Sequence, residues 1–188
     1  MCARFFTDEE SVRVAVRQAK TENPEVWTVP HGDHFPGTKT VVIAGYKNEL
    51  HAGLMTWGLP RWDNKGLIIN TRSETAFEKK MFQESIQKRR CVIPARGFYE
   101  WDAEKKLVSF TGSDHGVIYL AGLFSIENGI HRYSVLTTEP NESVAPFHDR
   151  MPVLLEKDAI EEWVFDLSAA EKLMKKEMPL LRSSGSIV

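Results

Sequence analysis

Apolar residues recur every three or four positions in several segments of the chain, which is the spacing of an amphipathic helix. The first segment contains Val12, Ala15, Val16 and Ala19. We expect helices at about 8–20, 71–88, 157–165 and 168–176. At the start of three of them, a Ser or Thr stands three residues before a Glu, which is the pattern of a capping box. These pairs are Thr7 with Glu10, Thr71 with Glu74, and Ser168 with Glu171.

Other segments are rich in Val, Ile and aromatic residues and are bounded by turn residues, as is typical of strands. They lie at about 40–46, 51–57, 67–70, 107–111, 117–124, 130–138 and 153–155. The dipeptide Asn128-Gly129 separates two of them and is a strong hairpin signal. Strands and helices are mixed without a repeat or a linker, so we expect one α+β domain at 1–180. The polar end at 181–188 is expected to be a disordered tail.

The composition is that of an ordinary globular protein of one domain. Its 188 residues are 42% hydrophobic and 27% charged, with a formal net charge of −2. Any anion-binding surface must therefore come from a local cluster of basic residues. The two cysteines, Cys2 and Cys91, are no disulfide framework and indicate a reducing compartment. No apolar run reaches membrane-spanning length, so we expect a cytoplasmic protein with no membrane partner.

Candidate chemistry begins with Met1-Cys2. An initiator Met is removed when the next residue is small, and the mature chain would then begin with the adjacent amine and thiol of Cys2. Their reference pKa values, roughly 7.7–8.0 and about 8.5, make both groups partly nucleophilic near neutral pH. Such a pair condenses with an aldehyde to an imine and then to a thiazolidine ring, or acts in acyl transfer. The alternative is that Cys2 is an arbitrary second residue.

Further polar residues could complete a site. Glu100 stands between Tyr99 and Trp101, and in a strand it would face the opposite side from both. A carboxyl group among aromatic rings tends to have a raised pKa and suits proton transfer, unless the side chain faces solvent. Asn70 and Arg72 lie at a predicted junction of strand and helix, where anions bind readily.

Two more features allow more than one interpretation. His148 lies among an acid, a base and two prolines, which is a poor setting for a core histidine, although Asp149 could simply pair with Arg150. Cys91 follows the basic run 88–90, which suits the end of a helix, and precedes apolar residues. We expect it to be an inert buried thiol.

Two loops could bind a ligand. The turn-rich loop 30–37 contains His31, Asp33 and His34, but a plain surface loop is favoured over a metal site. The aromatic loop 57–62 could offer a stacking platform, and we expect one of its Trp residues to be buried and one to lie at the surface.

Four separated motifs carry a family resemblance. They are Met1-Cys2-Ala3-Arg4, Asn70-Thr71-Arg72-Ser73-Glu74, RRCVIPARGFYEW at 89–101, and His148-Asp149-Arg150-Met151-Pro152-Val153. Together, over about residues 1–165, they resemble the SOS response-associated peptidase family, which includes proteins that crosslink to abasic sites in single-stranded DNA. The resemblance implies a compact α+β fold around a mainly antiparallel, β-barrel-like sheet with flanking helices.

The resemblance also implies roles, residue by residue. The catalytic set is Cys2, Asn70, Glu100 and His148, with Cys2 as the crosslinking nucleophile, and Arg4 and Arg72 resemble phosphate-binding residues. Trp57 or Trp101 could stack on bases beside the lesion. With Pro30, these residues form the predicted DNA-binding set. The implied partner is single-stranded DNA that contains abasic sites, with no cofactor and no metal. We expect a monomer in the bacterial cytoplasm or nucleoid, or one that is phage-encoded.

The chain departs from the family pattern at four places, which bears on geometry and affinity more than on chemistry. Ala3 replaces the usual Gly and restricts the backbone beside Cys2. Thr71 replaces Ala, an Ile is missing before Pro60, and Arg96 stands where a polar or acidic residue is common.

Three functions remain open at this point. The first is the sensing of abasic sites in single strands and their shielding by a covalent thiazolidine, with associated lyase activity. The second is an N-terminal-nucleophile amidase or autopeptidase that uses the same Cys2, with Asn70 as an oxyanion donor and removal of Met1 as its output. The third is a single-stranded DNA-binding module without chemistry.

Overall fold

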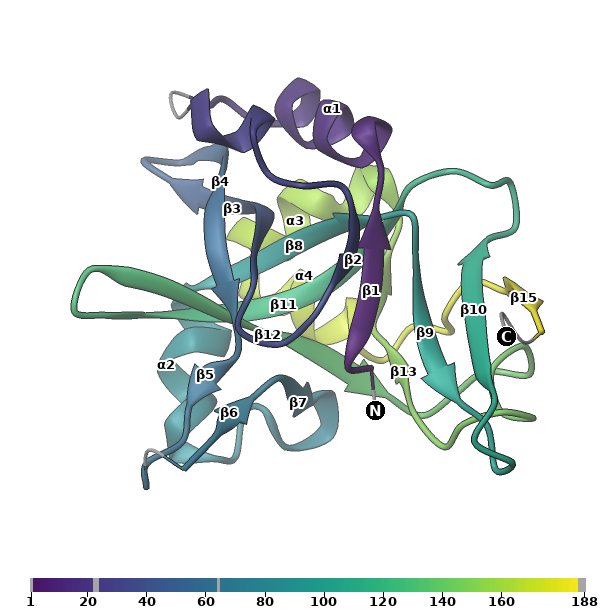
Figure 1. Ribbon diagram of the computed structural model, residues 1–188. Helices are drawn as coiled ribbons and strands as arrows, with labels where there is room; N and C mark the ends of the chain where they lie inside the picture. The colour runs from purple at the N-terminus through teal and green to yellow at the C-terminus, as the bar shows by residue number, and fades with distance from the viewer. Residues whose placement is uncertain (1, 22–23, 64, 186–188) are drawn as a thin grey trace.

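In the computed structural model, which describes residues 2–21, 24–63 and 65–185, five of the described strands close into a barrel (Figure 1). They are β3 (Lys39–Tyr46), β4 (Glu49–Trp57), β8 (Arg90–Ala95), β11 (Ile118–Glu127) and β12 (Ile130–Thr138). Antiparallel pairing joins β4, β3, β8, β11 and β12 in that order, and a parallel pairing of β12 with β4 closes the ring. The prediction of an α+β fold with a mainly antiparallel, barrel-like sheet is confirmed.

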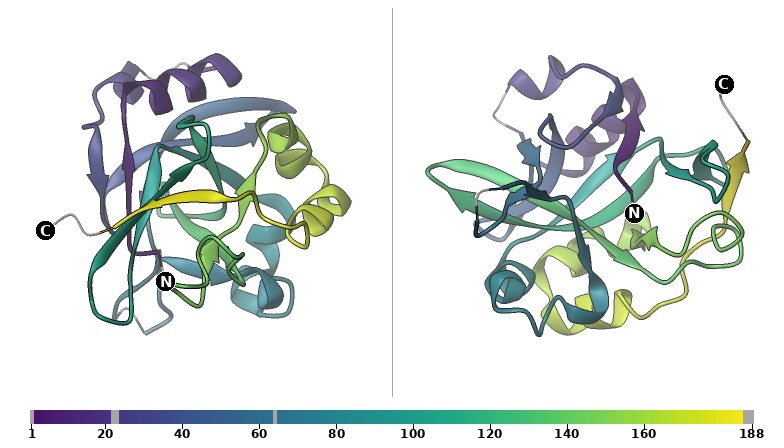
Figure 2. Two further views of the ribbon diagram at one scale, coloured as in Figure 1. Left: turned by 90° about the vertical axis from the view of Figure 1, so that its right-hand side faces the viewer. Right: turned by 60° about the horizontal axis from the view of Figure 1, so that its bottom comes forward.

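A second antiparallel sheet carries the N-terminal strand beside the barrel (Figure 2). In spatial order its strands are β15 (Leu181–Ser184), β10 (Leu107–Gly112), β9 (Gly97–Trp101), β1 (Arg4–Thr7) and β2 (Gly32–His34). Only Arg96 separates the barrel strand β8 from β9, so the chain passes directly from one sheet to the other. Because Arg4 lies opposite Tyr99, Cys2 and Ala3 lie near Glu100 in the neighbouring strand.

Shorter elements complete the fold. The remaining strands are β5 (Leu59–Pro60), β6 (Leu67–Ile68), β7 (Asn70–Arg72), β13 (Met151–Pro152) and β14 (Leu154–Leu155). The helices are α1 (Glu9–Gln18), α2 (Lys80–Lys88), α3 (Ile160–Phe165) and α4 (Leu167–Leu173), with 3₁₀ turns at η1 (Pro24–Trp27), η2 (Ser73–Thr75) and η3 (Lys157–Ala159). None of the described helices has both the length and the apolar character that crossing a membrane requires.

Aromatic residues fill the barrel interior. Trp57 and Tyr133 are fully buried and stack with ring centroids 6.3 Å apart. The Trp57 indole N–H donates to the backbone carbonyl of Ile69 at 2.9 Å, which fixes the ring inside. Trp62 is 87% exposed, so the predicted division of the two Trp residues between core and surface is confirmed. Cys91 is buried as expected, and burial raises the pKa of its thiol.

The N-caps of two helices differ from the prediction. Asp8, not Thr7, caps α1, and its carboxylate accepts from the backbone N–H of Ser11 at 2.9 Å. Asp166, not Ser168, caps α4. Asp is as good an N-cap as Ser or Thr, and here each Asp lies at the point where the preceding chain is still extended.

The expected helix at 71–88 is also wrong in its first half. Residues 70–72 form β7, which pairs in parallel with β12, and α2 begins only at Lys80. The Thr71 hydroxyl lies 2.9 Å from that of Ser134 and the Glu74 carboxylate binds Arg150, so neither side chain caps a helix. Pairing with a distant strand has overridden the local signal.

The C-terminal segment is ordered further than expected. Residues 181–184 form β15 and pair with β10, with Leu181 buried opposite Gly112. The expectation of a disordered tail is therefore wrong for these residues, because an unpaired edge of the second sheet accepts them. Residues 186–188 of the expected tail lie outside the described residues.

A buried arginine joins two helix ends to the barrel. Arg90 ends the basic run 88–90 and is 3% exposed. Its guanidinium donates to carbonyls of Ile86 and Gln87 in the last turn of α2, and to those of Trp163 and Val164 in α3. The run does end a helix, as predicted, but Arg90 caps carbonyls of both helices from inside the protein.

We expect Arg90→Lys to lower the free energy of unfolding by about 2–4 kcal/mol, since an ammonium cannot reproduce the planar fork and leaves buried carbonyls without donors. Urea denaturation followed by circular dichroism measures this. The control is Arg89→Lys, because the Arg89 side chain pairs with the exposed Glu84. Equal stability of both variants would contradict the role of Arg90.

Candidate active site

Cys2 lies two residues before β1 and is fully buried. Its thiol donates to the carbonyl oxygen of Arg4 at a distance of 3.7 Å. Burial, and after it the charge of Glu100, raises the pKa of the thiol well above its usual value. The sulfur is therefore protonated at neutral pH, and a reaction at this atom needs a base close by.

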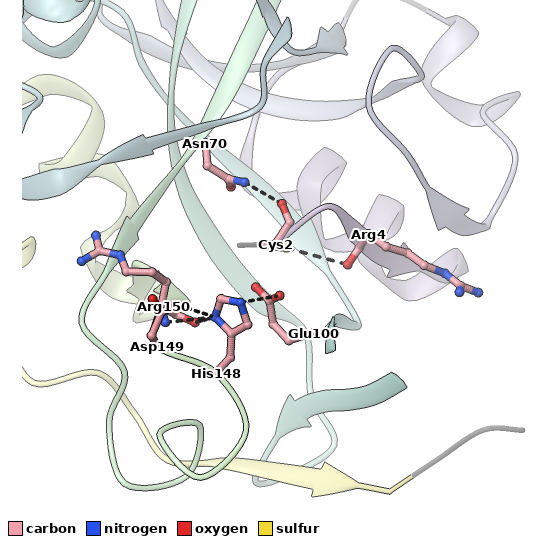
Figure 3. A network of polar contacts seen from close by, with 7 residues as sticks. All are labelled: Cys2, Arg4, Asn70, Glu100, His148, Asp149 and Arg150. Atoms are coloured by element: carbon pink, nitrogen blue, oxygen red, sulfur yellow. Dashed lines mark hydrogen bonds and ion pairs between the residues drawn. The ribbon is translucent and has the colours of Figure 1, made fainter. Parts of the chain in front are cut away.

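Asn70 holds the backbone of Cys2 in place. It is the first residue of β7 and lies opposite Val135 of β12. Its side-chain N–H donates to the Cys2 carbonyl oxygen at 2.8 Å, and so joins residues 68 positions apart (Figure 3). Asn70 therefore contacts the carbonyl side of Cys2.

Glu100 is the buried carboxylic acid of the site. It is 2% exposed, whereas its neighbours Tyr99 and Trp101 face the opposite side of β9 and are more exposed, as the alternation of the strand requires. Burial raises the pKa of Glu100 to about 7. A group with this pKa can both accept and release a proton at neutral pH.

His148 faces Glu100 from a different part of the chain. Its Nε2 lies 3.5 Å from Glu100 Oε2 (Figure 3). Three groups lie beside Nδ1: the backbone N–H of Arg150 at 3.0 Å, the carbonyl oxygen of Arg150 at 3.2 Å and Oδ1 of Asp149 at 3.1 Å. In the protonated ring, Nδ1 can therefore donate to one of these oxygens while Nε2 carries a proton on the side of Glu100. Burial lowers the pKa of His148, so the neutral ring dominates near pH 7.

An ion pair connects the segment that carries His148 to the segment that carries Asn70. The Arg150 guanidinium donates to both carboxylate oxygens of Glu74, at 2.8 and 2.9 Å, and to the Thr137 carbonyl at 2.7 Å. Thr137 lies in β12, which pairs with both β7 and β13. The sequence suggests that Arg150 could pair with Asp149, but Asp149 is exposed and the bidentate partner is Glu74.

We expect Glu74→Gln to lower the free energy of unfolding by about 1–3 kcal/mol, because it leaves the nearly buried Arg150 guanidinium without its carboxylate. It should also slow any step that depends on His148, whose ring is held by the Arg150 backbone. Urea denaturation and single-turnover kinetics measure the two effects. Glu78→Gln removes an exposed acid four residues away and should change neither, so equal effects in both variants would contradict the role of the pair.

The four residues of the predicted catalytic set thus converge from four separate segments on one end of β1. Residues 1–184 match the sequence model of a family described as SOS response associated peptidase (SRAP). The chain belongs to the SRAP family.

Relatives of this SRAP chain are named for abasic sites. The abasic site processing protein YoqW of Bacillus subtilis (strain 168) is 32% identical, over 87% of this chain and 80% of that protein. The abasic site processing protein YedK of Escherichia coli (strain K12) is 29% identical, over 100% and 87% of the two chains.

Solved structures share the fold of the chain. A protein from Bacteroides thetaiotaomicron superposes with a TM-score of 0.82 at 20% identity, over 98% of this chain and 91% of that chain. A phage-related protein from Bordetella bronchiseptica gives the same TM-score and identity, over 100% and 95%.

Arg4 and Arg72, the two predicted phosphate-binding residues of this SRAP chain, differ in their surroundings. Arg4 forms an ion pair with Asp33, and its guanidinium lies over the rings of Tyr99 and Phe35, 4.6 and 5.4 Å from their centroids. Arg72 is exposed at the end of β7, two residues beyond Asn70. Both therefore lie on strands that lead into the site.

The three other predicted DNA-binding residues differ in how exposed they are. Trp57 is fully buried inside the barrel and cannot offer a ring face to a base, so its assignment to DNA binding is wrong. Trp101 is 58% exposed beside Glu100 and remains available. Pro30 is exposed in a hollow that also contains Asp33 and His34.

Asp33 and His34 of loop 30–37 are engaged in contacts within the protein. The His34 ring lies 2.8 Å from the Thr7 hydroxyl through Nε2 and stacks on Phe5, and Asp33 binds Arg4. Among the described residues, no group of three potential metal ligands occurs.

Sequence reasoning missed two kinds of residue at this SRAP site. The first is Glu74, the partner of Arg150. The local pattern predicts that it caps a helix, although its place in the same motif as Asn70 could have indicated a position near the site. Phe35 and Tyr99 under the Arg4 guanidinium carried no signal, because a cation–π contact between separate strands has no sequence spacing.

Proposed function

We propose that the mature chain forms a covalent thiazolidine crosslink with abasic sites in single-stranded DNA, and so shields the lesion. One observation supports it above all: the residue that becomes the N-terminus, Cys2, is fixed by Asn70 directly beside Glu100, whose pKa is raised to about 7 by burial. An amine, a thiol and a proton carrier are thus together. Names of relatives that refer to abasic site processing agree with this substrate.

The first steps make the aldehyde reactive and capture it. An abasic deoxyribose is mostly a closed hemiacetal. The protonated form of His148 donates its Nε2 proton to the ring oxygen as the C1′–O4′ bond breaks, and the Glu100 carboxylate takes the proton of the C1′ hydroxyl, which leaves an aldehyde, a neutral His148 and Glu100 in its acid form. The Cys2 amine then adds to C1′. Glu100 in its acid form protonates the departing hydroxyl, water leaves, and an imine remains.

Ring closure completes the crosslink. The sulfur of Cys2 adds to the imine carbon, and a C–S bond replaces the C=N π bond. Because the thiol is protonated, Glu100 as carboxylate accepts that proton and returns it to the nitrogen. Asn70 keeps the Cys2 backbone in one orientation during both additions.

The single strand is held mainly through its backbone. Arg4 and Arg72 supply positive charge on two strands of the site, and the exposed ring of Trp101 can stack on a base beside the lesion. An abasic site has no base to unstack, so a single strand reaches Cys2 at low cost. The same imine explains an associated lyase activity, since it acidifies the neighbouring sugar carbon.

Incubation of the protein with abasic and intact single-stranded oligonucleotides, followed by denaturing gels, tests the proposal. A heat-stable shifted band with abasic DNA only is expected. An N-terminal-nucleophile peptidase would release Met1, seen by mass spectrometry, without ever forming a DNA adduct. A non-covalent binding module would bind both oligonucleotides in native gels and give no band in denaturing ones. Either result would reject the crosslink.

A further inference from the structure

A groove whose ionisable side chains are all basic lies outside the barrel, on the far side of β4 from Trp57. Its volume is about 420 Å³. It is lined by Gly37, Lys39, Leu54, Thr56, Gly129, Ile130, His131 and Arg132. Of the residues that the structure describes, no acidic one lines it.

The basic residues form a row across three neighbouring strands. Lys39 of β3 lies opposite Thr56 of β4, which lies opposite Arg132 of β12. Because Trp57 and Tyr133 face the barrel interior, Thr56 and Arg132 face outward. Adjacent strands are about 4.8 Å apart, so the two cationic residues flank the hydroxyl of Thr56 within roughly 10 Å of each other. A tetrahedral oxyanion fits between two such cations.

These charges are not neutralised from within the protein. Neither Lys39 nor Arg132 forms an ion pair with a carboxylate of the described residues, in contrast to Arg4, Arg61 and Arg96, which each do. The Arg132 guanidinium donates instead to the carbonyl of Gly58 at 3.4 Å, which is a neutral partner. Lys39 also borders the hollow that contains Glu25 and Asp33, but Asp33 is paired with Arg4. The two cations therefore give this face a local positive charge in a chain of net charge −2.

One loop connects the groove to the active site. Phe35 lies under the guanidinium of Arg4, while Gly37, two residues on, lines the groove and donates its N–H to the Trp57 carbonyl at 2.8 Å. Figure 1 shows this segment between β2 and β3 passing from the N-terminal end of β1 to the start of β3. A strand that contacts Arg4 therefore reaches Lys39 by crossing a single loop.

We propose that the groove of Lys39, Thr56 and Arg132 binds a backbone phosphate of the same DNA strand, a few nucleotides from the lesion at Cys2. The guanidinium and the ammonium would bind the non-bridging oxygens, and the hydroxyl would add a hydrogen bond. The site contacts no base, so it strengthens the binding of longer strands whatever their sequence. The inference rests on the proposed function, because it places the lesion at Cys2.

The test compares oligonucleotides of two lengths that carry a central tetrahydrofuran, an abasic analogue that cannot open to an aldehyde. The probes are a trimer and a 15-mer. The test variant is the double substitution Lys39→Gln/Arg132→Gln. The control, Lys175→Gln/Lys176→Gln, removes the same charge beside α4. Fluorescence anisotropy at several salt concentrations gives each affinity. For the 15-mer, the slope of log K against log salt should shrink by about 0.7 per lost phosphate contact in the first variant only.

The trimer extends only one nucleotide to either side of the lesion, so it should bind the wild type and both variants alike. Thermal melting shows whether each variant is folded. An unchanged slope with the 15-mer overturns the proposal and is also the result expected if the groove binds an acidic protein segment. Equal losses of affinity for both lengths, or equal losses in the control variant, overturn it as well.

Crosslinking to a natural abasic 15-mer is measured separately. If the wild type fails to crosslink but the slopes differ, the proposed function fails and the phosphate site stands.

Discussion

Replacing Cys2 with Ala should abolish the heat-stable crosslink to abasic DNA and leave a reversible imine. Alanine is small enough for Met1 to be removed, so the variant keeps an α-amine at the same position but has no thiol to close the ring. The imine hydrolyses on denaturing gels and also promotes strand cleavage by β-elimination. We expect no heat-stable band, residual cleavage of the abasic strand, and an adduct that borohydride reduction traps.

Two controls separate this result from loss of folding. Cys91→Ala removes the other thiol, which lies inside the barrel and has no part in the mechanism, and this variant should crosslink like the wild type once thermal melting shows it to be folded. A residue added permanently before Cys2 removes the amine and should abolish both the crosslink and the borohydride-trapped adduct. A heat-stable product from Cys2→Ala would show that the sulfur is not needed and that the thiazolidine mechanism is wrong.

Much of the barrel could be predicted from the sequence, but its closure could not. The segments rich in Val, Ile and aromatic residues and the Asn128-Gly129 turn indicate the long strands, which the structure pairs as the hairpins β3–β4 and β11–β12. The parallel pairing of β12 with β4 closes the ring, and it joins residues more than 70 positions apart. Nothing in the local pattern specifies such a pairing, because it depends on which edges remain free once the hairpins form.

The chemistry of the candidate site could be predicted from the sequence, but its geometry could not. The residue types at Cys2, Glu100 and His148 indicate their chemistry by themselves, and the alternation in 97–101 places Glu100 on the buried side of its strand. Their convergence is implied by the family resemblance alone. The bond from Asn70 to Cys2 and the pair of Arg150 with Glu74 cross 68 and 76 residues, and side chains at such distances leave no periodic signal.

The failures share one physical cause. Local patterns favour helix caps at Thr7 and Thr71, but Thr7 bonds to His34 in the neighbouring strand and Thr71 to Ser134 of β12. A hydroxyl group can form its hydrogen bond with a residue that is distant in sequence, so the tertiary fold decides its partner. A tryptophan in a polar loop can stack on a base, which is why Trp57 is expected at the DNA, yet it is the last residue of a barrel strand and faces inward.

Glu100→Gln should slow formation of the crosslink by roughly 10²–10⁴-fold while DNA affinity stays nearly unchanged, because the amide keeps the shape and loses the proton transfer. Ring closure can be isolated as the conversion of borohydride-reducible imine into heat-stable product. In the wild type its rate should rise with pH through about 7, as Glu100 ionises and becomes able to accept the thiol proton. In the variant this inflection should disappear. His148→Ala, which affects sugar opening, should slow the overall reaction and keep the inflection.

The stability of the protein gives an independent check on the same group. A carboxyl whose pKa is raised by folding binds more protons in the native state than in the unfolded state between its two pKa values. For Glu100 these are about 7 in the folded protein and 4.5 as the ordinary value, so its contribution makes the free energy of unfolding fall as the pH rises across this range. Urea denaturation from pH 4.5 to 8 should show a weaker fall in Glu100→Gln than in the wild type. An identical pH dependence in the two proteins, together with an unchanged rate of ring closure, would mean that Glu100 is neither the buried titrating group nor the proton carrier of the site.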